Sequence, residues 1–289
     1  MKRGRAIAWV VLLAVIATVA VFFAARPREP VYQGKRLSEW LQDLSSDTVT
    51  KKSRAQATEA LRRIGTKGIP FMERMLRSDP WWQRKLIELS GKQSVIRLQL
   101  TTEKERCLLA LGGIEALGPL ARPLIPRLIE MLKDDSSWTF AVVALIRIGS
   151  DAVLPLTQAL TNATPHMRSA AIVSLGLLRS NAQAAVPALV ERLESDKDNR
   201  VRASAVTALG YIGTEPEMVV PTLIKHLSDA DPDIRGQTAH ALAKFGGQAQ
   251  AAVPMLLKMM KDENPAVRNS AAVALREIEP HAAAKPEVK

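Results

Sequence analysis

The sequence is poor in the residues that strands, disulfides and zinc sites require. Phe, Trp and Tyr make up only 4% of the chain, whereas alanine and leucine dominate its periodic segments, a balance that favours an all-helical protein. Cys107 is the single cysteine, so an intramolecular disulfide framework is excluded. It lies in the apolar run CLLAL and is expected in the core. Cysteine pairs and an HExxH motif are both missing, which removes the commonest zinc patterns.

Catalytic patterns are missing as well. The sequence has no glycine-rich phosphate loop, and no nucleophile, base and orienting acid can be assembled from it. Its four histidines are scattered, and we expect them to be ordinary surface or core residues: His166, His226, His240 and His281. We therefore predict no catalytic residues, no metal ligands and no cofactor.

Acidic residues are few in the first third of the chain. Residues 1–100 hold 19 Lys and Arg against 8 Asp and Glu, while residues 101–289 hold 21 of each, so the net charge of +11 lies near the N-terminus. Attraction to phosphate needs cations clustered on the binding face, and the neutral repeats described below do not supply them. Nucleic acid is therefore an unfavoured partner. Contact with nucleic acid or anionic lipid through the basic region 51–97 stays open as an alternative.

One long hydrophobic run is present, at residues 6–25 (AIAWVVLLAVIATVAVFFAA). As a helix it would span roughly 30 Å, the thickness of a bilayer's hydrocarbon core. The basic tail 1–5 precedes it, and Phe22 and Phe23 occupy positions where a signal-peptide cleavage site needs small residues. We therefore favour a transmembrane anchor or signal-anchor over a cleaved signal peptide.

The orientation of this span is inferred from the short tail, because cations flank both ends of the run. A tail of five residues with three cations is expected to stay in the cytoplasm. We predict a single-pass membrane protein whose large C-terminal part is extracytoplasmic.

The juxtamembrane segment 26–49 contains a short amphipathic stretch. Leu37, Trp40, Leu41 and Leu44 share one face of a helix. We expect this helix to cap the N-terminal end of the fold that follows it. A helix lying in the plane of the membrane is the alternative.

The C-terminal half repeats one amphipathic segment. RVRASAVTALGYIG (200–213) returns as DIRGQTAHALAKFG and as AVRNSAAVALREIE with its register kept. The copies share a leucine column with spacings of 34, 33 and 33 residues: Leu175, Leu209, Leu242 and Leu275. A fixed period in this range is typical of a solenoid, in which short hairpins share one core by stacking on their neighbours.

Each repeat is predicted to form two helices. Thr164-Pro165, Asp231-Pro232 and Asn264-Pro265 each combine a capping side chain with a proline at the first helical position. Glycines such as Gly213 end the first helix, and a proline column opens the second: Pro187, Pro221 and Pro254. We expect about six helical pairs plus a terminal helix within residues 50–280. A disordered tail, 281–289, would follow.

The pattern VRxxAxxALGxIG, followed by a proline that opens a second apolar helix, resembles the HEAT-repeat family, in particular the short HEAT-like repeats of phycobilisome lyases. The resemblance covers residues 50–280. The segment YQGKRLSEWL (32–41), after a single span, also resembles membrane-anchored HEAT-repeat proteins of certain bacteria. The resemblance implies an all-α fold: a right-handed α-solenoid of HEAT-like helical hairpins, preceded by one N-terminal transmembrane helix, that binds partners along its concave surface.

The repeat type alone does not determine the function, because HEAT-like repeats occur both in scaffolds and in enzymes. A related di-iron hydroxylase uses His-Glu pairs as ligands, whereas the histidines here are followed by other residues: Met167, Leu227, Ala241 and Ala282. The leading prediction is therefore a membrane-anchored module for protein–protein binding or scaffolding, without catalysis and with an unknown protein partner. A lyase-type or hydroxylase-type enzyme is the alternative.

The most regular polar feature is an arginine column: Arg168, Arg202, Arg235 and Arg268. It is compatible with an anion-binding stripe. We interpret it instead as a structural ladder, in which each guanidinium bonds carbonyls or acidic side chains between adjacent repeats. Polar positions of the second helices carry mixed charges, which favours a protein partner over a polyanion: Glu130, Gln158, Glu191, Lys225 and Lys258.

The period is interrupted at residues 77–100. Trp81 and Trp82 lie there beside Arg84 and Lys85. Adjacent tryptophans with neighbouring cations are typical of an interaction hot spot, so this cluster is the candidate partner contact. Packing against the first repeat is the competing interpretation.

Overall fold

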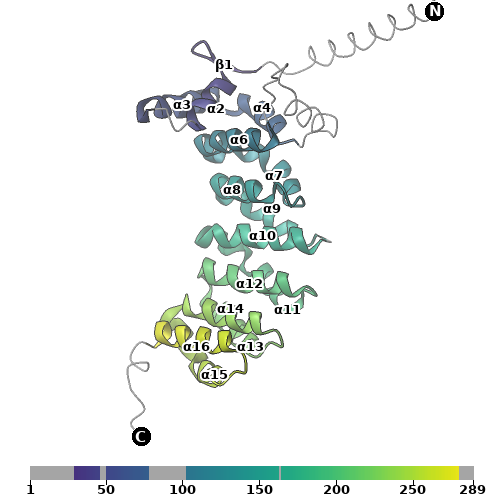
Figure 1. Cartoon of the computed structure of the whole chain (residues 1–289), viewed down its shortest axis with the longest axis vertical. Helices are drawn as coiled ribbons and strands as arrows, with labels where there is room; N and C mark the ends of the chain where they lie inside the picture. The colour runs from purple at the N-terminus through teal and green to yellow at the C-terminus, as the bar shows by residue number, and fades with distance from the viewer. Residues whose placement is uncertain (1–28, 46–49, 78–101, 163, 280–289) are drawn as a thin grey trace, which may run out of the picture.

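The computed structural model describes residues 29–45, 50–77, 102–162 and 164–279. These residues form an elongated stack of helices whose order along the long axis follows the order in the chain (Figure 1). The predicted basic tail 1–5, the predicted membrane span 6–25 and the tail 281–289 lie outside the described residues.

The described residues contain six helix pairs, one helix before them and one helix after them. The first helices of the pairs, called A helices, are α3 (Lys51–Ile64), α6 (Glu103–Leu117), α8 (Trp138–Ile148), α10 (Pro165–Leu177), α12 (Asn199–Ile212) and α14 (Pro232–Ala243). The B helices are α4 (Ile69–Met75), α7 (Ile125–Met131), α9 (Val153–Ala159), α11 (Val186–Ser195), α13 (Pro216–His226) and α15 (Val253–Met259). The last helix is α16 (Pro265–Ile278).

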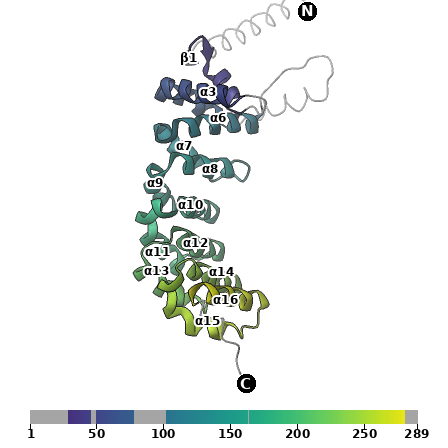
Figure 2. The same ribbon diagram turned by 90° about the vertical axis from the view of Figure 1, so that its left-hand side faces the viewer.

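The A and B helices lie on two different sides of the stack. Figure 2 shows α8, α10, α12 and α14 on one side and α9, α11 and α13 on the other. In most pairs a short 3-10 helix makes the connection: η1 (Gly65–Gly68), η2 (Gly118–Leu124), η3 (Ser150–Ala152), η4 (Arg179–Ala185) and η5 (Gly246–Ala252). One continuous apolar core runs between the two sides, so the predicted mostly helical solenoid is confirmed.

The N-terminal end departs from the all-α expectation. A two-stranded antiparallel hairpin pairs β1 (Val31–Tyr32) with β2 (Lys35–Arg36), and it is followed by α2 (Leu37–Ser45). The two turn residues have positive φ, as the tight hairpin turns that match strand twist require. Each strand has only two residues, too few to show the alternation by which strands are recognised in a sequence. Helix α2 packs on α3 and α6, which covers the end of the stack.

Capping side chains start several A helices. Asp198, Asp231 and Asn264 accept hydrogen bonds from the backbone N–H two residues ahead, at 2.8–2.9 Å. Thr164 is the N-cap residue and Pro165 the first residue of α10, as predicted, but the predicted cap bond is wrong, because the Thr164 hydroxyl makes no hydrogen bond to α10. The side chain of Asn162 instead accepts from both the hydroxyl and the N–H of Thr164, each at 3.0 Å, which directs the hydroxyl away from the helix.

A residue with positive φ lies at or shortly after the end of each A helix. Gly213 has φ 63°, and the corresponding position of the preceding pair is occupied by Arg179, with φ 53°. Glycine adopts this conformation without steric cost, while a residue with a Cβ is disfavoured there by about 1 kcal/mol. Arg179 is therefore a locally unfavourable choice, and it raises the question of what its side chain does.

Very small residues let the A helices pack closely. A Cβ built on Gly176 would lie 2.9 Å from the Cα of Ala208, and one built on Gly210 would lie 2.9 Å from the Cα of Ala241. Such distances are below any real carbon contact, so both positions require glycine unless the backbones separate. The leucines of the predicted column next to these contacts, Leu175, Leu209 and Leu242, are fully buried.

The proline column opens the B helices with one exception. Pro187 and Pro254 lie at the second position of α11 and α15. Helix α13 begins five residues before its column proline, so Pro221 lies inside the helix and the prediction for this pair was wrong. The reason is that this pair has no 3-10 connection; Glu215 reverses the chain in a left-handed conformation, and the helix starts at once with Pro216.

Within the described residues, one helical stretch is long and apolar enough to cross a membrane by length and composition, Glu103–Met131. It comprises α6, η2 and α7, which form the second pair of the stack. Many of its apolar side chains are buried against neighbouring helices, among them Ile114, Leu124 and Leu128. The run is accounted for by the core of the solenoid.

Candidate functional site

An ionic ladder joins the repeats from α10 to α16, and it involves the predicted arginine column. Arg168, near the start of α10, donates from Nε and Nη2 to the two carboxylate oxygens of Asp196, both at 2.7 Å. Its Nη1 donates to the carbonyl of Asn162 in the preceding pair at 2.9 Å. Arg168 thus connects the end of its own pair to the end of the pair before it.

The same pattern recurs at the following pairs. Arg235 donates to both oxygens of Asp262 at 2.9 Å and to the carbonyl of Asp229 at 2.9 Å. The middle step is looser, since Arg202 Nη2 lies 3.6 Å from Asp229 Oδ1. Arg268 ends the ladder by donating to the carbonyl of Asp262 at 2.7 Å. All four arginines of the column are therefore engaged between repeats.

Two carboxylates of the ladder, Asp196 and Asp262, have lowered pKa values. Burial raises the pKa of Asp196, but hydrogen bonds from Arg168 and from the N–H of Asp198 outweigh it, so this pKa lies below its ordinary value. The hydrogen bond from Arg235 lowers the pKa of Asp262. A pKa that is lower in the folded state contributes stability above the unfolded value, near pH 4, and the contribution is lost as the pH falls through the folded value.

The ladder stops between α8 and α10. In α8, the position that corresponds to Arg168 is occupied by Trp138. After α9, the position that corresponds to Asp196 is occupied by Asn162. Both partners are thus replaced together, which leaves neither a buried cation nor a buried carboxylate without its counter-charge. The ring of Trp138 contacts His166 edge-on, with centroids 6.1 Å apart.

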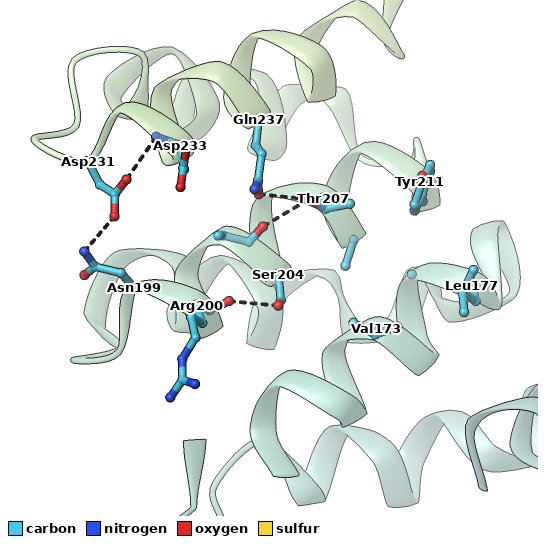
Figure 3. A pocket seen from close by; sticks show the side chains of 13 residues that line it. Val173, Leu177, Asn199, Arg200, Ser204, Thr207, Tyr211, Asp231, Asp233 and Gln237 are labelled. Atoms are coloured by element: carbon cyan, nitrogen blue, oxygen red, sulfur yellow. Dashed lines mark hydrogen bonds between the residues drawn. The ribbon is translucent and has the colours of Figure 1, made fainter. Parts of the chain in front are cut away.

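A groove runs along the exposed side of α12, between α10 and α14 (Figure 3). Its volume is about 410 Å³, within the usual range of ligand pockets. We call it the α12 groove, and it is lined by Val173, Gly176, Leu177, Asn199, Arg200, Ala203, Ser204, Thr207, Ala208, Tyr211, Asp231, Asp233 and Gln237. Its α12 residues recur at intervals of three and four from one end of the helix to the other, so the groove follows the whole helix.

The groove is hollow because its floor residues are small and its rim residues are long. Gly176 and Ala208 lie at the close approach of α10 and α12, and Ala203 adds no more than a methyl group. Leu177 and Tyr211 stand at one end, exposed by 44% and 42% respectively. Large apolar side chains exposed beside a concave surface are typical of a protein contact site.

Polar contacts position the walls of the groove. Asn199 Nδ2 donates to Asp231 Oδ2 at 2.8 Å, which links α12 to the start of α14. Thr207 Oγ1 donates to Gln237 Oε1 at 3.2 Å halfway along the groove. Figure 3 shows Asp233 and Gln237 pointing from α14 toward α12. The hydrogen bonds from Asp233 N–H and Asn199 lower the pKa of Asp231, so its carboxylate is ionised at neutral pH.

At the end of the groove opposite Asp231, the side chain of Arg179 makes a contact that accounts for its unfavourable backbone conformation. Its guanidinium lies over the ring of Tyr211, 5.7 Å from the ring centroid, within the range of a cation–π contact. The glycines of the column, such as Gly213, cannot make such a contact. Sequence analysis missed the α12 groove, although an arginine in a column of glycines was a signal that could have directed attention to it.

A second cavity, of about 890 Å³, lies on the B side between α7 and α9. Ile125, Ile129 and Leu154 line it, and Leu154 is 66% exposed. Of the B-helix positions selected from the sequence, Gln158 contributes to this cavity. The others lie apart from it: Glu130, Glu191, Lys225 and Lys258.

The other sequence-predicted residues are quickly placed. Trp81, Trp82, Arg84 and Lys85, the candidate partner contact, lie outside the described residues. Cys107 is buried in α6. Within the part of the chain that the structure describes, no three His, Cys, Asp or Glu side chains gather in a way that could hold a metal ion.

The helix pairs, their fixed period and the ladder together define a helical-repeat solenoid with an open groove. The family of HEAT repeats matches residues 125–210 and 220–286, just over half of the chain, and the chain belongs to this family. The family of PBS lyase HEAT-like repeats matches residues 201–229. The predicted repeat type is thus confirmed. No curated protein matches the sequence.

Several solved structures are similar in fold. The complex of CpcE and CpcF of phycocyanin lyase from Nostoc sp. PCC7120 is 23% identical, with a TM-score of 0.48, over 53% of this chain and 98% of that chain. Human deoxyhypusine hydroxylase is 21% identical, with a TM-score of 0.37, over 84% and 96%. The karyopherin Kap121p, bound to the extreme C-terminus of the phosphatase Cdc14p, is 15% identical, with a TM-score of 0.48, over 84% and 29%.

Proposed function

We propose that this HEAT-repeat chain is a protein-binding scaffold without catalytic activity, a right-handed solenoid tethered to a membrane through residues 6–25. The observation that carries the binding role is the α12 groove, which follows the exposed face of one helix from end to end. An elongated hollow with a small-residue floor and exposed apolar residues at one end suits a segment of another protein better than a compact metabolite.

The tether is supported by the sequence of residues 6–25, which is uncharged and long enough for a bilayer. With the basic tail 1–5 in the cytoplasm, the repeats within residues 50–280 would be extracytoplasmic, as in a membrane-anchored bacterial protein of this repeat type. In that arrangement the solenoid presents its A helices to partners outside the cytoplasm. Residues 78–101, with the cluster of Trp81, Trp82, Arg84 and Lys85, remain a second candidate contact.

The binding role is tested by photocrosslinking in cells. A photoreactive amino acid replaces Thr207, an exposed residue at the middle of the α12 groove. The matched control replaces Thr139, an exposed threonine of the A helix α8 that does not line the groove. We expect a protein adduct of one defined mass from position 207 and not from 139. Equal adducts from both positions, or none from either, would contradict docking at this groove.

The tether is tested separately by fractionation and by a reporter. The full chain should stay in the membrane fraction after alkaline extraction, and removal of residues 6–25 should release it. A reporter enzyme active only outside the cytoplasm, fused after Lys289, should be active. An alkali-soluble full chain would disprove the anchor, and an inactive reporter would reverse the orientation.

A further inference from the structure

The two ends of the α12 groove carry opposite charges. At one end, Asp231 and Asp233 belong to the first turn of α14, and the carboxylate of Asp233 is on an exposed residue. At the other end, the exposed side chain of Arg179 lies over the ring of Tyr211; Tyr211 lines the groove, and Arg179 lies just outside the lining. The remaining charged residue of the lining, Arg200, is already paired with Asp198, with Nη2 at 3.1 Å from Oδ2. The groove is therefore electrically polar along its length.

Arg179 points independently to a ligand at its end of the groove. It is the residue in the glycine column that keeps a side chain despite the left-handed backbone, while Gly149 and Gly213 occupy the same position in the pairs before and after it. Such local strain is retained where the side chain has a use. A guanidinium that lies over an aromatic ring can still donate from its N–H groups, and a carboxylate is the group that these donors fit best.

The length of the groove sets the length of its occupant. From Asn199 to Tyr211, α12 advances by twelve residues, which is about 18 Å at about 1.5 Å per residue. An extended peptide covers about 3.3 Å per residue, so five or six residues fill the same distance. The small floor residues Ala203 and Ala208 leave room for short apolar side chains in between.

We propose that the α12 groove binds an extended peptide segment of five or six residues, with a lysine or arginine beside Asp231 and Asp233, apolar residues over the floor, and an acidic side chain at Arg179. This deepens the proposed docking function and rests on it, since it states which partner segment the groove selects and in which direction it lies. The charge pairs determine direction, because a reversed segment would bring like charges together at both ends.

The test uses the full chain in detergent and three labelled hexapeptides, with binding measured by fluorescence anisotropy. The first peptide has lysine at one end, glutamate at the other, and alternating leucine and alanine between them. The second reverses lysine and glutamate, and the third replaces both by glutamine. We expect the better of the two charged peptides to bind at least tenfold more tightly than the uncharged one. Equal affinities for all three, or binding by none, would overturn the proposal.

Two variants assign the ends. Asp233→Lys should lower the affinity for the preferred peptide at least fivefold, and a peptide with glutamate in place of its lysine should recover the loss. Arg179→Gly should remove the preference for glutamate while raising the melting temperature, because glycine relieves the backbone strain. An Arg179 that serves only its contact with Tyr211 would leave the peptide affinity unchanged in Arg179→Gly, and this result would contradict the proposal.

A matched control and the crosslinking result complete the design. Glu277→Lys changes an exposed charge of α16 outside the groove and should leave the affinities unchanged. If Glu277→Lys weakens binding as much as Asp233→Lys, the effect is one of net charge and the proposal is wrong. If the hexapeptides bind equally while position 207 still crosslinks a protein in cells, the charge inference fails and the docking function stands.

Discussion

The repeats from α10 to α16 are joined by one recurring contact of an arginine with a carboxylate and a carbonyl, whereas those from α3 to α9 are joined by several different contacts. In the C-terminal half, the arginine column bonds a carboxylate and a carbonyl at successive turns. In the N-terminal half, Arg62 donates to the carbonyl of Ala116 at 3.3 Å and Arg127 to the carbonyl of Leu76 at 3.1 Å. Arg147 lies 3.4 Å from Glu115 in an exposed ion pair.

This difference follows from the regularity of the period. A ladder needs each arginine to meet the turn before it and the turn after it, so equal repeat lengths of 33 or 34 residues are a condition for it. Helix α8 is shorter, with 11 residues against 13 in α10, and its period breaks the alignment. The HEAT match over residues 125–210 and 220–286 covers most of the laddered half, and it also covers α7 to α9. Regular spacing and polar linkage therefore go together in this solenoid.

The largest expected effect is the loss of a ladder carboxylate. The side chain of Asp196 is only 1% exposed and pairs with Arg168 through two bonds. Replacing it in Asp196→Ala leaves a half-buried guanidinium without its partner and should lower the free energy of unfolding by about 2–3 kcal/mol. Urea unfolding followed by circular dichroism measures this.

The matched substitution in the N-terminal half is Glu115→Ala. It breaks an ion pair whose two side chains are at least half exposed, and should change stability by less than about 0.5 kcal/mol. A cost for Asp196→Ala no greater than that of Glu115→Ala would show that the ladder adds no stability, and the contrast between the halves would then be one of sequence alone.

The next effect concerns close packing of helices. In Gly210→Ala the new Cβ meets the backbone of Ala241, so the helices must separate, at a net cost of about 1–2 kcal/mol. Gly112 in α6 has only an ordinary contact, 3.5 Å from Ser45 Oγ, so Gly112→Ala should stabilise by about 0.5–1 kcal/mol through helix propensity. Thermal melts of Gly210→Ala and Gly112→Ala measure the two changes in stability. Shifts of the same sign would mean that both halves tolerate the same helix spacing.

The smallest effect concerns helix caps. Asn264 accepts from the N–H of Ala266 at 2.8 Å, so Asn264→Ala should cost about 1 kcal/mol. Thr164, at the junction of the two halves, makes no cap bond to its helix, and Thr164→Ala should cost less than about 0.5 kcal/mol. The midpoints of denaturation of Asn264→Ala and Thr164→Ala, each compared with the unchanged protein, measure the two losses of stability. A larger loss at Thr164 would indicate that the junction depends on its contact with Asn162.

Much of the architecture could be predicted from the sequence because its signals are local or periodic. The leucine column required a repeated buried face, and Gly213 marked a helix end that has the expected left-handed backbone. The hairpin at residues 31–36 could not be predicted, because two-residue strands show no periodicity in the sequence. The cap at Thr164 was predicted wrongly because a neighbouring side chain, Asn162, competes for the hydroxyl, and a pattern of residue types does not register that competition.

The α12 groove was not predicted from the sequence for a different reason. Its lining comes from three helices and extends from Val173 to Gln237 along the chain. The groove exists because small residues in two of these helices approach closely. Arg168 and its equivalents are regular and could be recognised as a column, whereas Arg179 is irregular. The residue that departs from the repeat, Arg179, is the one that lies over Tyr211 at the end of the groove.

Alone, the amino-acid sequence determined a chain of short amphipathic helices with a common period, since helix caps, stops and buried faces depend on neighbours within a few turns. The sequence also determined that this chain belongs to the HEAT-repeat family. Tertiary structure decided which side chains meet: the pairing of Arg168 with Asp196, the stacking of Arg179 on Tyr211 and the hollow along α12. These depend on the distance and rotation between stacked pairs, which arise only when many weak packing contacts are satisfied together.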